Sequence, residues 1–360
     1  MPSESVGTPP GDPHGFFICP ERAFFLQPPA LVPLFQINSG PTRRPAEPKL
    51  LPLARFGIDC LTARAPAGQV FFPGSKPCKE QTQMRKIRLI KNARPSIDGA
   101  GVHLFRAFGF GDERLFDPFL MLDDFRNDDT RNYLPGFPWH PHRGIETITY
   151  MLEGSAEHSD SMGNSGVIGK GDVQWMTAGK GVIHQEMPKP NSLGRMYGFQ
   201  LWTNLPKTKK MMPPRYRDIK AADIPLVKTA SGAEVKVICG TYEGVNGPTR
   251  DIIIEPQYWD VYVPPSTQLV LPAPSGETCF LYAYEGEASI GEQPVRNRQT
   301  ALLDDGDEVE INASGAGFRM LFLRGKPLNE SISWRGSIVM NTREEIETAF
   351  RELEKGTFLK

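Results

Sequence analysis

Three histidines and a glutamate form two alternating pairs whose spacing suits metal binding. His140 and His142 are separated by one residue, and His184 and Glu186 are separated in the same way. Alternate side chains of a β-strand share a face, so each pair can point to one side of its strand. Two neighbouring strands of this kind would place three imidazoles and one carboxylate around a single point. The spacing therefore predicts a metal site.

The residues themselves leave the fourth ligand open. Glu146 follows His142 by four residues and Glu186 follows His184 by two, so alternation directs either carboxylate to the site. One would coordinate the metal and the other would hydrogen-bond nearby. We expect His158, in the polar segment 157–160, to be solvated. His14 and His103 have no partner in the sequence and are interpreted as incidental.

The donor set narrows the chemistry of the ion. Three nitrogens and one oxygen around a six-coordinate ion leave two positions open, enough for a bidentate substrate or for a substrate beside dioxygen. A tetrahedral zinc ion with the same ligands would be closed and structural. Iron (Fe²⁺), manganese, nickel and copper all accept these donors. The sequence does not choose among them.

Composition and charge exclude several other classes of protein. The chain has 41 basic and 42 acidic residues and a net charge of −1. This balance argues against a basic surface that binds nucleic acid. No segment reaches the ~18–20 apolar residues of a membrane span, and acidic residues near the start argue against a signal peptide. The five cysteines are odd in number and scattered, which indicates a reducing cytoplasm rather than a disulfide framework.

Residues 1–83 differ in composition from the rest of the chain. They hold 15 of the 34 prolines and three of the five cysteines, with little periodicity. We predict a disordered N-terminal extension of low order. It is either an upstream start-site extension or leader, which we favour, or a mobile regulatory arm. Strand-like alternation begins at Met84.

From Met84 onward, short β-type runs alternate with turn residues, which predicts an all-β barrel or sandwich architecture. Examples are 145–151, 235–238, 251–254, 280–283 and 320–323. The segments 150–156 and 282–288 resemble each other, and each precedes a Gly-Asp turn, which indicates two copies of one barrel. No histidine follows His184, so the second copy lacks a comparable site. We divide the chain into a metal-binding barrel at 84–222 and a structural barrel at 223–360.

One helix is predicted, at 343–355. Thr342 and Glu345 have the capping-box spacing, and Gly356 closes the helix. Apolar residues recur at helical spacing, at positions 346, 349, 350 and 353. We expect this face to pack over a barrel and assign it no catalytic role.

The spacing of the metal motifs resembles that of the cupin superfamily. The residues within and around these motifs resemble those of the pirin family. The superfamily pattern maps to Gly136, His140, His142, Glu146, Gly154, Gly171, Gly179 and His184. The segments 140–147, 171–179, 200–205 and 339–342 look like pirin signatures. The resemblance covers the chain from Met84 to its end and does not reach residues 1–83. Two residues depart from the family pattern, and neither is a predicted ligand. Gln185 stands where many relatives have Ala, and Ile145 stands where Phe is common.

This resemblance implies a bicupin, with two tandem cupin (double-stranded β-helix) barrels and one iron in the first. Its ligands would be His140, His142, His184 and Glu186, which leaves Glu146 to face a ligand or the substrate. Some pirin-like proteins open the flavonol quercetin with dioxygen, and others are redox-sensitive co-regulators that bind protein partners. The chain would then be a cytoplasmic oxidoreductase (a quercetinase), with Glu186 or Glu146 as general base. The alternative is a regulator without turnover. We expect a monomer that binds a small aromatic ligand or a protein, without direct nucleic-acid or membrane contact.

Aromatic residues lie near both motifs, at Phe125, Phe137, Trp139 and Trp175. They could line a pocket above the metal, but we favour the barrel core for each of them.

Overall fold

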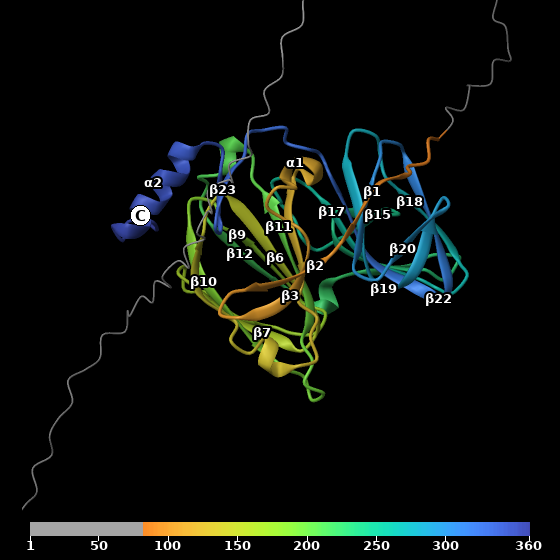
Figure 1. The fold of residues 1–360 in the computed structure, drawn as a ribbon, viewed down its shortest axis with the longest axis horizontal. Helices are drawn as coiled ribbons and strands as arrows, with labels where there is room; N and C mark the ends of the chain where they lie inside the picture. The colour runs from red at the N-terminus through yellow and green to blue at the C-terminus, as the bar shows by residue number, and fades with distance from the viewer. Residues whose placement is uncertain (1–81) are drawn as a thin grey trace, which may run out of the picture. The chain divides into compact units, whose positions relative to one another are not determined.

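The computed structural model describes residues 82–360, so predictions for 1–81, including His14, lie outside the described residues. Almost all of the regular structure in the described part is β (Figure 1). The strands form two barrels in tandem, followed by a single C-terminal helix. The predicted fold class is therefore confirmed from residue 82 onward. Among these residues no helix is long and apolar enough to cross a membrane.

The N-terminal barrel consists of a seven-stranded sheet and a four-stranded sheet. The larger sheet has the order β12-β9-β6-β11-β4-β3-β2 and comprises β2 (Arg94–Asp98), β3 (Val102–Phe108), β4 (Phe119–Asp124), β6 (Ile145–Glu153), β9 (Val173–Thr177), β11 (Tyr197–Asn204) and β12 (Arg215–Ile219). The smaller sheet has the order β5-β10-β7-β8 and comprises β5 (Phe137–His142), β7 (Ser155–Asp160), β8 (Ser165–Ile168) and β10 (Val182–Lys189). A short helix, α1 (Glu113–Phe116), precedes β4.

The interior of this barrel is not uniformly apolar. On strand β6, Ile145 belongs to one hydrophobic cluster and Met151 to another. Thr147 and Thr149 lie between them on the same face of the strand and are also buried. A polar layer therefore separates two apolar ends of the barrel.

The C-terminal barrel is built on one nine-stranded sheet. The strands of this sheet follow the order β1-β21-β19-β22-β17-β14-β13, and in addition β18 pairs with β22 and β20 pairs with β19. The strands are β1 (Ile87–Asn92), β13 (Leu226–Lys228), β14 (Glu234–Cys239), β17 (Gln257–Val263), β18 (Gln268–Pro272), β19 (Thr278–Ile290), β20 (Gln293–Arg296), β21 (Gln299–Leu303) and β22 (Glu308–Gly325). Two hairpins complete the fold: β15 (Thr241–Tyr242) with β16 (Val245–Asn246), and β23 (Ser333–Arg335) with β24 (Ile338–Met340). One continuous hydrophobic cluster fills the interior of this barrel.

The two ends of the described chain cross between the barrels. Strand β1, which we assigned to the first barrel, lies among the strands of the second in Figure 1. It pairs there with β21. Conversely, Ile338 in β24 bridges to Arg143 of the first barrel. The predicted boundaries 84–222 and 223–360 therefore do not describe these end segments, because sequence order does not reveal long-range strand pairing.

The predicted repeat forms reciprocal contacts between the barrels. The Tyr150 hydroxyl of the first barrel donates to Asp260 Oδ2 of the second at 2.6 Å. The Tyr282 hydroxyl, at the matching position of the second copy, donates to Asp124 Oδ2 of the first at 2.8 Å. The repeated tyrosine thus bonds the two copies to each other.

Most of the predicted strands are present, but 251–254 is a turn. Asp251 and Glu255 have φ of 57° and 46°, which are incompatible with a strand. Ile252 and Ile254 nevertheless bury their side chains in the cluster between the barrels. The apolar run 252–254 therefore reflects burial rather than strand pairing.

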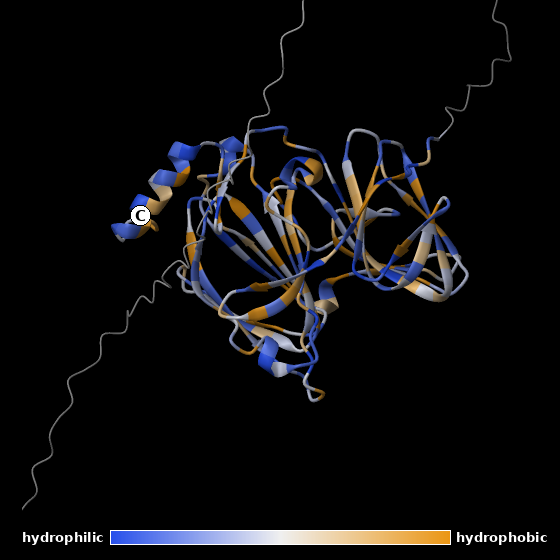
Figure 2. Cartoon of the chain, viewed as in Figure 1, coloured by the Kyte–Doolittle hydropathy of each residue, from blue (hydrophilic) through white to orange (hydrophobic). Residues whose placement is uncertain are grey.

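The C-terminal helix is α2 (Arg343–Glu354), and its predicted capping box is present. Thr342 Oγ1 accepts from the Glu345 amide, while the Glu345 carboxylate accepts from the Thr342 amide. Hydrophilic and hydrophobic residues both occur along α2 in Figure 2. Ile346 and Ala349 on its apolar face pack in one cluster with Ile183 of β10. The predicted packing of the helix over a barrel is confirmed.

Candidate metal centre

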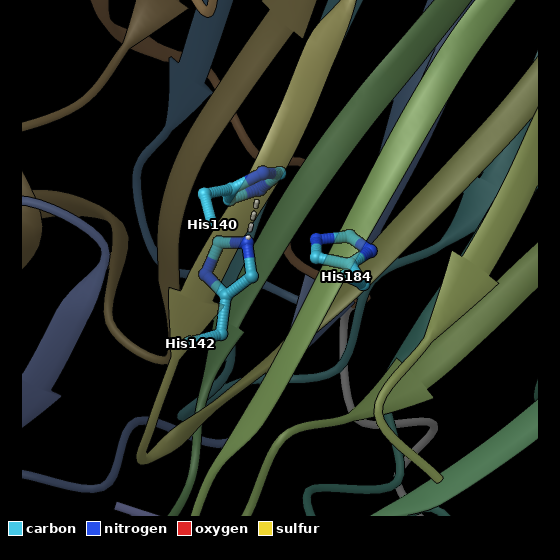
Figure 3. A group of neighbouring side chains, drawn as sticks. All are labelled: His140, His142 and His184. Carbon is cyan, nitrogen blue, oxygen red and sulfur yellow. Dashed lines mark hydrogen bonds between the residues drawn. The ribbon is translucent and has the colours of Figure 1, made fainter. Parts of the chain in front are cut away.

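Strands β5 and β10 bring the three predicted histidines together. These strands are antiparallel neighbours, with His184 directly opposite His140. Figure 3 shows the imidazoles of His140, His142 and His184 turned toward one another. One ring nitrogen from each forms a group in which all the atoms lie within 4.8 Å of one another. The predicted approach of the three histidines from two neighbouring strands is present.

The ring nitrogens of His140 and His142 are arranged as metal ligands would be. Nδ1 of His140 lies 2.8 Å from the Pro138 carbonyl oxygen, and Nδ1 of His142 lies 3.2 Å from the Ser337 carbonyl oxygen. A carbonyl only accepts, so in each neutral ring the proton is on Nδ1 and Nε2 keeps its lone pair. The two Nε2 atoms are 3.0 Å apart. Two lone pairs this close are unfavourable without a cation, which is evidence that the site fits a metal ion.

Burial keeps these histidines neutral, as metal ligation requires. His142 and His184 are 1% and 0% exposed. Burial, followed by the neighbouring imidazoles, lowers the pKa of His142 and of His184 well below the ordinary value. Burial also lowers the pKa of His140. Nε2 of His184 is buried and has no hydrogen-bond partner, so it too is available to an ion.

Glu186 lies beside the histidines but is not within the 4.8 Å group. Its Oε1 accepts from Thr149 Oγ1 at 2.7 Å, and its Oε2 accepts from Gln200 Nε2 at 2.8 Å. Trp202 Nε1 donates to Gln200 Oε1 at 3.1 Å and so fixes the direction of that amide. The carboxylate is therefore held by the polar layer of the large sheet. Its predicted role as fourth ligand remains a prediction.

Glu146 is not where alternation placed it. The chain turns at Gly144 (φ 78°), between strands of two different sheets, and this breaks the alternation that begins at His142. The Glu146 carboxylate accepts from Thr177 Oγ1 at 2.7 Å and from Thr203 Oγ1 at 3.4 Å. Burial raises its pKa. The prediction that it shares a face with His142 is wrong.

Glu146 instead lies on the side of β6 that faces the second barrel. Its strand neighbours Ile148 and Tyr150 belong to the cluster between the barrels. Burial, and next the Glu146 charge, raise the pKa of the Cys239 thiol in the second barrel to about 12. Glu146 is thus a buried carboxyl of the interface.

His158 was expected to be solvated and is instead buried beside the site. It is 1% exposed, and its Nδ1 lies 3.5 Å from Nδ1 of His184. In the structure Ala156, His158 and Asp160 alternate as buried residues after the turn at Gly154, but the polar sequence of this segment gives no signal of that burial. His103 is exposed on β3 and plays no part in the site.

A small cavity adjoins Glu186 within the barrel. It has a volume of about 20 Å³, and its walls are Leu104, Asp123, Phe125, Phe137, Thr149, Met151, Ala156, Glu186, Pro188, Met196 and Gln200. A space of this size holds roughly one water molecule. Of the aromatic residues near the motifs, Trp175 is in the core, whereas Trp139 is 52% exposed next to His140. The core assignment of Trp139 is wrong.

Comparison with known proteins identifies both barrels. The family model described as Pirin matches residues 101–203, and the model described as Pirin C-terminal cupin domain matches residues 258–359. A Pseudomonas aeruginosa protein, named by inference as a quercetin 2,3-dioxygenase, is 45% identical over 285 residues, spanning 76% of this chain and 98% of that protein.

Two solved structures extend the comparison. A quercetin 2,3-dioxygenase from Acinetobacter baumannii superposes with a TM-score of 0.71 at 32% identity, covering 77% of this chain and 99% of that one. A bacterial pirin from Escherichia coli, in complex with nickel(II), shares the fold with a TM-score of 0.51 at 20% identity, covering 66% of this chain and 99% of that one.

Proposed function

Because this chain belongs to the pirin family of the cupin superfamily, we propose that it is a mononuclear metal oxygenase of the quercetin 2,3-dioxygenase type. The reaction would open the ring of a flavonol with dioxygen. The observation that carries this proposal is the convergence of three neutral imidazoles on one point in the N-terminal barrel. The names of the Pseudomonas and Acinetobacter relatives supply the substrate class.

The proposed ligands are His140, His142, His184 and Glu186. Iron is our first choice of metal, with manganese, nickel and copper as alternatives, since imidazole and carboxylate donors suit all four. When bound, the ion would act as a Lewis acid that lowers the pKa of a substrate hydroxyl.

Within the protein, the group best placed to take the hydroxyl proton is Glu186. Hydrogen bonds from Thr149 and Gln200 orient its carboxylate, yet each oxygen keeps a second lone pair that can accept a proton. Glu146 is left out of this role because its carboxylate is bonded to Thr177 and Thr203 on the opposite face of β6.

The flavonol would approach from the exposed side of the site. The cavity beside Glu186 is about 20 Å³, whereas pockets for drug-sized ligands are roughly 300–1,000 Å³. His140 is partly exposed, so a larger ligand could reach the site from that side.

The test combines metal analysis with turnover. Protein purified without oxygen is assayed for metal, and then for consumption of quercetin and dioxygen with the native metal loaded. We expect about one iron per chain and equal consumption of the two substrates. Glu186→Gln should abolish turnover, and retained ring opening in that variant would remove Glu186 from the role of base.

The small cavity also favours a second candidate, a redox-sensitive co-regulator without turnover. Here a change of one unit of charge between ferrous and ferric iron would alter the surface around the site, and a protein partner would sense it. One bound metal without quercetin consumption would support this candidate. Partner binding that depends on the oxidation state of the iron would then establish it.

A further inference from the structure

We propose that His158 and Asp160 are positioning residues that fix which ring nitrogen of His184 faces the metal. This inference rests on the proposed metal site, although not on the proposed reaction. The other two histidines have backbone carbonyls beside Nδ1. His184 has none there, and a second buried imidazole takes that place.

The register of the small sheet brings these groups together. In the pairing of β7 with β10, Asp160 lies opposite His184, and His158 lies opposite Glu186. The side chains of His158 and Asp160 are fully buried. The His158 ring also stacks on Tyr216, with centroids 5.0 Å apart and planes 29° apart, which limits its rotation.

Hydrogen-bond logic allows one productive arrangement of protons. If His184 donates from Nδ1, then Nδ1 of His158 must accept, and the ring proton of His158 must be on Nε2. That nitrogen lies 3.5 Å from Asp160 Oδ2, which can accept it. His184 Nε2 is then left with a free lone pair for the metal.

The reverse arrangement fails at both ends. If His158 donated from Nδ1, neutral His184 would carry its proton on Nε2, the buried nitrogen that has no partner. His158 Nε2 would then direct its lone pair at the Asp160 carboxylate, which is repulsive. Asp160 therefore selects the arrangement in which His184 can ligate a metal.

Asp160 is itself held in place by the turn that follows it. Oδ1 accepts from the amides of Met162 and Asn164 at 2.8 and 3.0 Å. Oδ2 accepts from Asn164 Nδ2 at 2.8 Å. A carboxylate with three fixed donors is a stable acceptor, so the order Asp160–His158–His184 is built into the fold.

The test compares two substitutions of His158. His158→Phe keeps a ring against Tyr216 but removes the acceptor, whereas His158→Asn offers an amide oxygen in place of Nδ1. Metal affinity is measured by competition with a chelator, using zinc as the probe ion. We expect His158→Phe to weaken binding about 10–100-fold, and His158→Asn to restore most of that loss. His103→Phe, an exposed histidine outside the site, is the matched control and should bind as the wild type does.

A second readout does not depend on metal. Nitrogen NMR of the histidine rings in metal-free protein should show His184 protonated on Nδ1 in the wild type and shifted toward the Nε2 form in His158→Phe. If that variant fails to fold, Asp160→Asn and His158→Asn are examined in the same way. An Nε2-protonated His184 in the wild type, or wild-type affinity in a folded His158→Phe, would overturn the inference. Metal binding with the expected dependence on His158 but without quercetin turnover would refute the proposed function alone, whereas absence of metal binding in the wild type would refute both.

Discussion

The two barrels differ most in the middle layer of their interiors. The repeat that aligns Tyr150 with Tyr282 also aligns Thr149 with Leu281. Thr149 pairs across the sheet with Gln200, whereas Leu281 pairs with Phe322. The next strand carries Asp123 beside Gln200 in the first barrel and Trp259 beside Phe322 in the second. The two barrels therefore share one arrangement of strands. The matching interior positions hold a row of polar side chains in the first barrel and a row of apolar side chains in the second.

This difference shows how a duplicated barrel divides its roles. In the second barrel, Trp259 stacks on Phe322 with centroids 5.2 Å apart, and the interior is filled with side chains. Burial of each such side chain is worth about 1.5–3 kcal/mol. In the first barrel polar side chains occupy these positions, so part of this burial free energy is absent and Glu186 is held by hydrogen bonds instead. In the function proposed above, the first barrel would carry the chemistry, while the packed second barrel stabilises the chain.

The largest expected effect is on stability, from making the second barrel resemble the first. Leu281→Thr would remove packing and bury a hydroxyl without a partner, at a cost of about 2–5 kcal/mol in the free energy of unfolding. Urea unfolding measures this cost, with the volume-conserving Leu281→Met as control at less than about 1.5 kcal/mol. An equally stable Leu281→Thr protein would show that the apolar row is not needed for folding.

The converse change makes the first barrel resemble the second. Thr149→Val combined with Gln200→Leu removes both donors to Glu186, so metal affinity should fall about 10–100-fold. Thr203→Val is the matched control, because that hydroxyl faces Glu146 on the other side of the sheet. Chelator competition gives both affinities. Unchanged binding in the double variant would mean that the polar row does not support the site.

The reciprocal tyrosines should contribute equally to the contact between the barrels. Tyr150→Phe and Tyr282→Phe each remove a hydrogen bond to a buried carboxylate, and each should cost about 1.5 kcal/mol of stability without changing metal affinity. Thermal and urea unfolding of the two variants test this equality. A large cost at one position and none at the other would contradict the symmetry.

The last prediction concerns the dependence of stability on pH. Lys210 Nζ donates to Gly144 O, Asn204 Oδ1 and Val339 O, and burial lowers its pKa to about 7. An unfolded lysine keeps its proton to about pH 10.4. Between pH 7 and that value the unfolded state binds more protons, so this residue makes the free energy of unfolding rise with pH, by at most about 1.4 kcal/mol per unit.

Lys210→Met should remove that slope. Urea unfolding of wild type and variant at several pH values from 7 to 9.5 measures the difference between the two profiles, in which other titrating groups cancel. Parallel profiles would show that the lysine pKa is not lowered.

Local patterns were enough to predict the fold class and the three histidines. Strand alternation predicted the approach of His140 and His142 on β5 to His184 on β10, and the capping-box spacing at Thr342 predicted the final helix. The repeated tyrosine segment indicated two copies, and the family matches confirm two cupin domains.

Features set by distant contacts could not be predicted in this way. Glu146 was misplaced because the turn at Gly144 moves the chain into another sheet. His158 sits among Glu157, Ser159 and Asp160, a polar composition that indicates a loop, and only its pairing with β10 makes it buried. The crossing of β1 to the second barrel depends on β21, more than 200 residues later.

We propose that the N-terminal barrel binds one metal ion through its converging imidazoles. This proposal is tested most directly by equilibrium dialysis of the wild type and of His184→Ala against Fe²⁺ without oxygen, with metal content measured per folded chain. We expect about one ion in the wild type and a near-complete loss in the variant, with the fold retained. Equal metal content in the two proteins would contradict it.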